Sequence, residues 1–214
     1  MYESKKYYRG ESKKEITIEK VRILGIASSM RSNSHSTRLL NYVLQKALEY
    51  DAEVRSVNLS DSPLPFYRPG KDSVNNENIR LITRDVCWAD AYILASPDYH
   101  GSVSGTLKNF LDYFWKEFAG KTFGYIVASH EGGLTVMDQM RTAVRQCYGW
   151  SMPYGISING SKDLNNLGEF SDENLISRVE MLARDIVVYG GIIYGQFLKD
   201  KSSEVKSFAN RYNE

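Results

Sequence analysis

The chain is short of several features that define whole classes of protein. Of its 214 residues only two are cysteine and three are histidine, and 27 basic residues nearly balance 26 acidic ones. Three scattered histidines, with no cysteines or carboxylates clustered at ligand spacing, indicate no metal site. A net charge of +1 gives no overall field that would attract nucleic acid. We therefore expect neither a metalloprotein nor a nucleic-acid-binding protein.

Long apolar runs are also lacking. The longest, around 186–197, is interrupted by glycines and falls short of the roughly 18 residues that suggest a membrane span. Residues 1–20 carry charge but no apolar stretch of the signal-peptide kind. Cys87 and Cys147 both fall within apolar helical patterns, which predicts buried thiols in a reducing compartment. These observations predict a cytoplasmic protein with no membrane partner.

Length and composition predict one domain with two tails. A chain of 214 residues is long enough for one sizeable core. Residues 1–20 are polar and lysine-rich, which predicts a flexible N-terminal tail. The domain is expected over 21–190, and 191–214 would form a C-terminal extension with a short helix.

Within the domain, β-branched runs alternate with amphipathic segments. Strands are expected at 21–27, 52–59, 91–96, 122–129 and 153–160, and helices near 36–48, 74–88, 106–118, 134–148 and 172–189. Parallel neighbouring strands need crossover helices between them. The pattern predicts an α/β fold, with an open and mostly parallel sheet covered by helices on both faces. Ligands of such sheets bind at the carboxyl ends of the strands, so the loops after the first, third and fourth strands should share a site.

The first of these loops, 28–37, has the chemistry of a phosphate cradle. Ser29, Ser34 and Ser36 surround Arg31, and the loop opens a helix. A phosphate there would meet helix N-terminal N–H groups, serine hydroxyls and a guanidinium group. The loop lacks G-x-G-x-x-G and G-K-[ST], which favours a mononucleotide phosphate over a pyrophosphate or a triphosphate. The alternative is an ordinary capped helix with solvated serines.

The other two loops are suited to a flat ring. In 96–110 two glycines surround a turn of small residues just past a strand end, and 129–133 places a glycine pair at the next strand end. Glycines let the backbone approach a ring closely, and backbone groups can bind the ring's edge. Tyr99 would either cover a ring or pack the loop itself. His100 would either bind the ring or present only its backbone.

Two of these segments resemble a known family. S-M-R-S-N-S-H-S at 29–36 and P-D-Y-H-G-S-V-S-G-T-L-K-N at 97–109 resemble G-S-x-R-x-x-S-x-N and P-E-Y-x-x-x-x-x-G-x-L-K-N of the NAD(P)H-dependent FMN reductases. That family includes flavin, quinone, azo-dye and chromate reductases. L-P-F-Y at 64–67 is similar to the family's loop that flanks the flavin. The chain departs from the pattern at Ser28, often Gly; at Ser36, often Asn; and at His130 and Glu131, which replace smaller residues.

The resemblance implies a flavodoxin-like three-layer sandwich whose five parallel strands have the order 2-1-3-4-5. It implies that Ser29, Arg31, Ser34 and Ser36 hold the FMN phosphate. The ring would be lined by Pro97, Asp98, Tyr99, His100, Gly101, Ser129, Gly132 and Gly133. NADPH or NADH would donate electrons, which would leave to a flavin, a quinone or another small acceptor by ping-pong turnover. No catalytic side chain is expected, because the cofactor carries the redox chemistry.

The resemblance also implies a homodimer or a homotetramer. Tyr113 and Trp115 lie off the apolar stripe of the predicted helix at 106–118, and surface aromatics are enriched at interfaces. Two other functions stay open. One is a flavodoxin-like FMN carrier that does not itself oxidise nicotinamide, which the near-neutral charge and Arg31 disfavour. The other is an interaction module that has lost its cofactor.

Overall fold

The computed structural model describes residues 20–70, 76–165 and 167–212, so the predicted N-terminal tail lies outside the described residues except for its last position. The strands are β1 (Arg22–Ala27), β2 (Glu53–Asn58), β3 (Ala91–Pro97), β4 (Thr122–Ala128), β5 (Trp150–Ser151) and β6 (Ile156–Ile158). They form one parallel sheet in the order β2-β1-β3-β4-β5, and β6 also pairs with β4. The predicted order is confirmed.

The edge of the sheet next to β4 differs from the single strand predicted at 153–160. β5 pairs with the start of β4 at Thr122 and Phe123, and β6 pairs with its end from Ile126 to Ala128. Between the two short strands lies Pro153, which has no N–H group to donate to a ladder. The predicted five strands are therefore corrected to six, with β5 and β6 sharing one edge.

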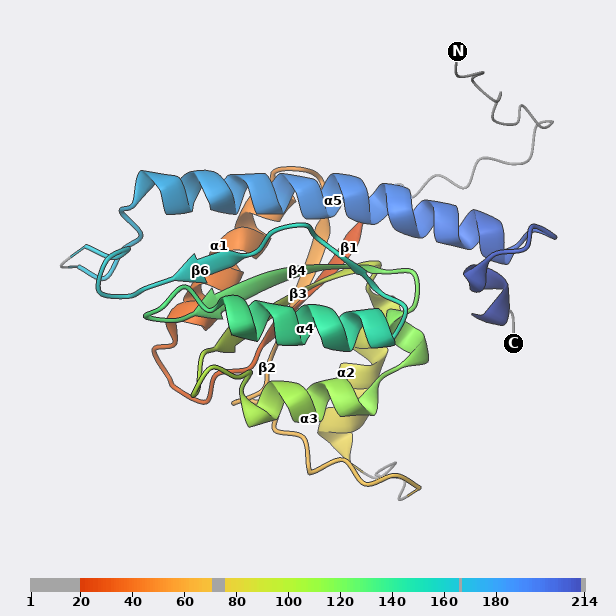
Figure 1. Ribbon diagram of the computed structural model, residues 1–214, viewed down its shortest axis with the longest axis horizontal. Coiled ribbons are helices and arrows are strands. Elements are labelled where there is room, and N and C mark those ends of the chain that lie inside the picture. The colour runs from red at the N-terminus through yellow and green to blue at the C-terminus, as the bar shows by residue number, and fades with distance from the viewer. Residues whose placement is uncertain (1–19, 71–75, 166, 213–214) are drawn as a thin grey trace, which may run out of the picture.

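The helices form a layer on each face of the sheet. α1 (His35–Leu48) and α5 (Glu173–Lys201) cover one face, and α2 (Glu77–Trp88), α3 (Gly105–Tyr113) and α4 (Leu134–Gln146) cover the other (Figure 1). The side chains of β3 divide between two cores, because successive residues of a strand point to opposite faces. Ile93 packs in the core beneath α1 and α5, whereas Tyr92 and Leu94 pack in the other core.

The helix predicted at 106–118 ends early, at Tyr113. A 3₁₀ turn, η1 (Lys116–Phe118), follows it after a short extended link. The Glu117 carboxylate accepts the N–H of Trp115 at 3.0 Å. In a continued helix this N–H would donate to a backbone carbonyl. Its bond to the Glu117 side chain competes with that helical bond and favours the extended link. The predicted apolar stripe is nevertheless buried on both sides of the break, at Leu107, Phe110, Leu111, Phe114 and Phe118.

The helix predicted to end near 189 runs on to Lys201. The glycines at 190 and 191 lie where the helix packs closely against its neighbours. A Cβ on Gly191 would lie 2.9 Å from Cγ2 of Val21, and one on Gly190 would lie 3.1 Å from Cβ of Ala91. α5 thus crosses the boundary placed at 190 without interruption, and the domain division stays a prediction. A second 3₁₀ turn, η2 (Phe208–Tyr212), packs back against the end of α5 (Figure 1).

The cysteines differ from the expectation of burial. Cys87 is exposed because the inward face of α2 is formed by Ile82 and Val86, and Cys147 is half-buried at the end of α4. Among the described residues, none of the helices has the length and apolar character to cross a membrane.

Candidate functional site

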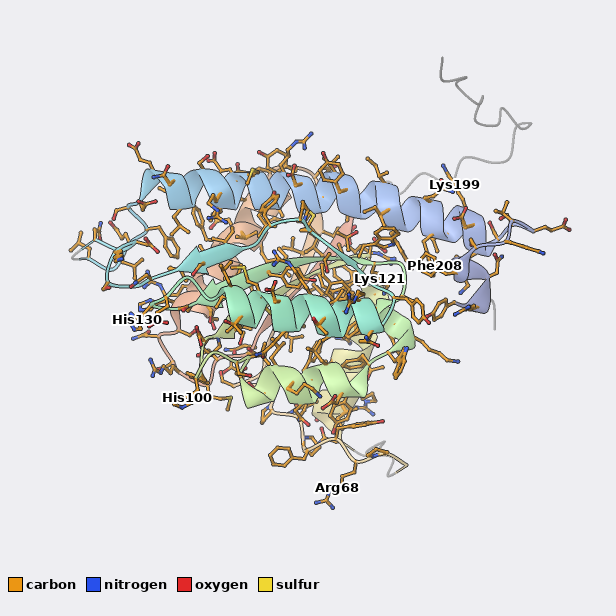
Figure 2. The ribbon with its side chains drawn as sticks, in the orientation of Figure 1. Arg68, His100, Lys121, His130, Lys199 and Phe208 are labelled. Carbon is orange, nitrogen blue, oxygen red and sulfur yellow. The ribbon has the colours of Figure 1, made fainter. Side chains whose placement is uncertain are left out.

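A cavity of about 760 Å³ opens where the strands end. Its walls come from the loops that follow β1, β3, β4 and β6. Figure 2 labels His100 and His130, which belong to this wall and lie at the same end of the molecule. The volume falls within the ~300–1,000 Å³ typical of small-molecule pockets. The carboxyl edge of the sheet is therefore the candidate site, as expected for a parallel sheet.

Most of the residues predicted for the site line this one cavity. They are Ser29, Arg31, Ser34, Pro97, Asp98, Tyr99, His100, Gly101, Ser129 and Gly133. Ser36 and Gly132 do not line it. Ser36 is fully buried, and its hydroxyl lies 2.9 Å from that of Ser34. Gly132 has a φ of +84° in the turn before α4. Contact between either residue and a ligand stays a prediction.

The sequence pattern missed the wall that follows β6. Asn159 and Gly160, at the end of the strand predicted over 153–160, line the cavity together with Ser161. The amide of Asn159 donates to the carbonyl of His130 at 3.3 Å, which joins this loop to the one after β4. Gly160 packs against the imidazole of His35, because an added Cβ would lie 2.3 Å from Nε2. The signal that could have found this loop is the Asn-Gly dipeptide, a common turn sequence.

The loop after β1 forms a cradle at the start of α1. Ser34 caps the helix, and its hydroxyl accepts the N–H of Thr37 at 3.3 Å. The other N–H groups of the first turn have no partner within the helix, and they carry the positive end of its dipole. Arg31 is exposed, and among the residues lining the cavity it is the sole arginine or lysine. Helix N–H groups, hydroxyls and one guanidinium group fit a phosphate dianion.

Ser28, one of the departures from the family pattern, braces this cradle from behind. Its hydroxyl donates to the carbonyl of Ala95 at 2.8 Å and accepts from Ser104 at 2.8 Å. The hydroxyl of Thr106 donates to the carbonyl of Ser28 at 2.5 Å. These bonds connect the residue after β1 to the start of α3, and they fix the position of the first loop relative to the second.

The second loop closes in a tight hairpin turn. Tyr99 and Ser102 exchange two backbone hydrogen bonds of 3.1 Å. The two residues between them, His100 and Gly101, have φ angles of 58° and 71°. Two successive positive φ angles define a type I′ turn. The turn presents Tyr99, 37 % exposed, at the cavity wall.

The 64–67 segment lies against α3 and not in the wall of this cavity. The amide of Asn109 donates to the carbonyl of Pro65 at 2.9 Å, and its oxygen accepts the N–H of Tyr67 at 2.8 Å. Figure 2 shows Arg68, which follows this segment, projecting away from the body of the protein. Any contact of the segment with a flavin stays a prediction.

The fold and site define a flavodoxin-like protein with a cavity at the switch point of its sheet, lined by a helix N-terminus, serine hydroxyls and one arginine. Comparison with known families is more specific: residues 21–163 match the family described as NADPH-dependent FMN reductase, and the chain belongs to that family. The resemblance read from the two motifs is confirmed. The protein is an oxidoreductase, and its cofactors are FMN and NAD(P)H.

Individual relatives agree with this assignment. The chain is 30% identical over 150 residues to the FMN-dependent NADPH-azoreductase of Staphylococcus aureus strain USA300. The aligned segment covers 66% of this chain and 78% of the relative. The fold is similar to that of FerB, a flavoenzyme NAD(P)H:(acceptor) oxidoreductase from Paracoccus denitrificans, with a TM-score of 0.67 at 19% identity over 81% of this chain and 98% of that one. It is also similar to the apo NADH:FMN oxidoreductase EmoB, with a TM-score of 0.65 at 21% identity over 78% and 88% of the two chains.

Proposed function

We propose that the protein oxidises NADPH or NADH through bound FMN and passes the electrons, by ping-pong turnover, to a flavin, a quinone, an azo compound or another small acceptor. The observation that carries the proposal is that the cradle at Arg31 and the turn at Tyr99 line the same cavity. An azo acceptor is included because the Staphylococcus aureus relative is an azoreductase by name. Ping-pong turnover is supported by the convergence of the loops on one cavity, since donor and acceptor would have to use that cavity in turn.

The chain's own residues would bind and orient the cofactor. Ser29, Arg31 and Ser34 would hold the phosphate, and the loops at 97–101 and 129–133 would enclose the ring. When bound, FMN supplies the hydride chemistry, while the protein supplies position and electrostatics.

We also propose that the protein is a cytoplasmic homodimer. Three aromatic side chains near α3 support an interface there: Phe66, Tyr67 and Trp115 are 84%, 43% and 62% exposed. Aromatic residues are enriched at the cores of protein interfaces. Sedimentation analysis of the Trp115→Glu variant tests this, since the wild type should sediment as a dimer and the variant as a monomer.

The cytoplasmic location is supported by the two cysteines, which form no disulfide and therefore suit a reducing compartment.

The test of the function is the visible spectrum of the purified protein under anaerobic conditions. Flavin bands that bleach on addition of NADPH or NADH, and return on addition of a quinone, support the reductase. Bound flavin that stays oxidised with both donors contradicts it and favours the electron carrier. Failure to bind added FMN contradicts both functions.

The phosphate cradle is tested with Arg31→Ala, with Arg80→Ala as the control because its side chain is 73% exposed on α2. Loss of a charge-assisted hydrogen bond should weaken FMN binding by about 10- to 100-fold in Arg31→Ala. Riboflavin has no phosphate, so its affinity should be unchanged. An equal loss for both ligands would place Arg31 away from the phosphate.

A further inference from the structure

Asp98 contacts two of the loops that line the cavity. One carboxylate oxygen, Oδ1, accepts the N–H of Gly101 at 2.8 Å, within the hairpin turn after β3. The other, Oδ2, accepts the hydroxyl proton of Ser129 at 2.8 Å, in the loop after β4. The backbone N–H of Asp98 donates to the carbonyl of Ala128 at 2.8 Å. Both oxygens of this half-buried carboxylate therefore have protein partners in different loops.

Ser129 continues the connection beyond Asp98. Its hydroxyl oxygen accepts the N–H of Glu131 at 3.1 Å, and its own N–H donates to the carbonyl of Ile158 at 3.0 Å. Ser129 is 8% exposed, so these bonds are shielded from water. An unbroken series of hydrogen bonds thus runs from Gly101 through Asp98 and Ser129 to Glu131. We call this series the loop clamp.

We propose that Asp98 is a positioning residue that fixes the 99–102 turn against the 129–131 loop, so that the slot for the flavin ring is formed before the cofactor binds. The inference rests on the proposed function, because it assigns these loops to the ring. Asp98 acts through its neighbours, and the bonds to the ring would come from the loops that it holds. Ligands bind more tightly to a site that is already ordered, since less conformational entropy is lost on binding.

The residue type at this position suits the clamp. The family pattern quoted above has Glu here, whose side chain is one methylene longer. The Asp98 carboxylate accepts the N–H three residues ahead, a local side-chain-to-backbone bond of the kind that short Asp side chains form in turns and helix caps. The clamp is therefore a property of this chain's own sequence.

The experiment measures FMN and riboflavin affinity by flavin fluorescence quenching in Asp98→Ala, Ser129→Ala, the double variant and Asp98→Asn. Asp138→Asn is the matched control, since this carboxylate is 72% exposed on α4. Asp98→Ala and Ser129→Ala should each lower the affinity for both ligands about tenfold, because charge-assisted hydrogen bonds are lost. The double variant should be no weaker than the weaker single variant, because both substitutions open the same clamp. Asp98→Asn keeps an oxygen for Gly101 and should recover most of the affinity.

The choice of ligands separates the clamp from the phosphate cradle. Asp98→Ala should lower the affinity for riboflavin as much as that for FMN, whereas Arg31→Ala should lower the affinity for FMN alone. Unchanged affinity in Asp98→Ala, a loss confined to FMN, or additive losses in the double variant would each overturn the proposal.

A second readout needs no cofactor. Amide hydrogen exchange of the cofactor-free protein should speed up in both 99–102 and 129–131 when Asp98 is replaced with alanine, and should stay slow in Asp98→Asn. Unchanged exchange at 129–131 in Asp98→Ala would overturn the clamp even if flavin binding could not be measured. Failure of the wild type to bind flavin would count against the proposed function, and the exchange data would still decide whether the clamp exists.

Discussion

Replacing Lys121 with methionine should stabilise the fold at neutral pH, because this lysine buries its ammonium group and forms no salt bridge with any described carboxylate. Lys121 is 5% exposed, at the end of the sheet opposite the cavity (Figure 2). Its Nζ donates to the carbonyl of Val86 and to the hydroxyl of Tyr92, each at 3.3 Å. Asp90, the acidic group with the largest effect on it, is itself bound by Arg22 at 2.6 Å. Burial therefore dominates, and it lowers the pKa of Lys121 from 10.5 to about 8.

The direction of the pH dependence follows from this lowered pKa. Below about pH 8 both the folded and the unfolded lysine carry a proton, so the folded state bears the full cost of the buried charge. As the pH rises from about 8 to 10.5, the folded lysine is neutral while the unfolded lysine is still charged, and the cost disappears. A difference of that size corresponds to about 3 kcal/mol, at ~1.36 kcal/mol per pKa unit. Methionine fills a similar volume, and the Tyr92 hydroxyl still donates to the Val86 carbonyl at 2.7 Å.

The assay is urea unfolding of the wild type and Lys121→Met from pH 7 to pH 10, with Lys116→Met as the control at an exposed lysine of η1. The free energy of unfolding of Lys121→Met should exceed that of the wild type by up to about 3 kcal/mol at pH 7, and the gap should shrink toward pH 10. The difference between the two proteins is the informative quantity. Other groups that titrate here, such as the Cys147 thiol whose pKa burial raises, are common to both. A variant that is less stable at pH 7, or a gap that does not change with pH, would refute the reasoning.

Two further predictions concern glycines of the cavity wall. Gly133→Ala should cost about 2–4 kcal/mol in thermal unfolding, because φ is +63° and the new Cβ would lie 2.5 Å from Cγ1 of Val127. Gly132→Ala has a positive φ but free space, so it should cost about 1 kcal/mol, and equal losses would contradict the steric argument. Gly160→Ala should cost about 1–3 kcal/mol in the wild type and almost nothing in a His35→Ala background, because the imidazole is the group that it would displace. A loss that persists without His35 would show that the backbone at 160 is the cause.

The fold could be predicted from the sequence because its signals are local and repeated. Buried β-branched runs such as 21–27, separated by amphipathic helices, leave few alternatives to a parallel three-layer sheet. The errors came where a tertiary contact overrides a local rule. Gly190 and Gly191 predict the end of a helix from their sequence, yet their lack of a Cβ lets α5 approach Val21 and Ala91 closely. The split edge at β5 and β6 depends on pairing with β4, which no local pattern contains.

The candidate site was predictable in its location but not in its last wall. Loops after β1, β3 and β4 carried unusual residues in a recognisable order, so their convergence followed from the topology. The loop at 159–161 carried only its Asn-Gly turn signal, which does not show that the loop contacts His35 and His130. Spacing also could not show that the 64–67 segment is held against α3 by Asn109.

A sequence motif identifies the polar residues of a site without showing which of them face the ligand. The hydrogen-bonding capacity of each side chain separates the two groups. Ser28 donates to Ala95 and accepts from Ser104, and each oxygen of Asp98 already accepts a bond from a protein donor, so both side chains are engaged in holding the loops together. Arg31 is exposed at the cavity, and its guanidinium group forms no salt bridge within the described residues. Substitution should therefore act in two ways: at Arg31 the loss should depend on the ligand's phosphate, whereas at Asp98 it should follow the geometry of the loops whatever ligand is used.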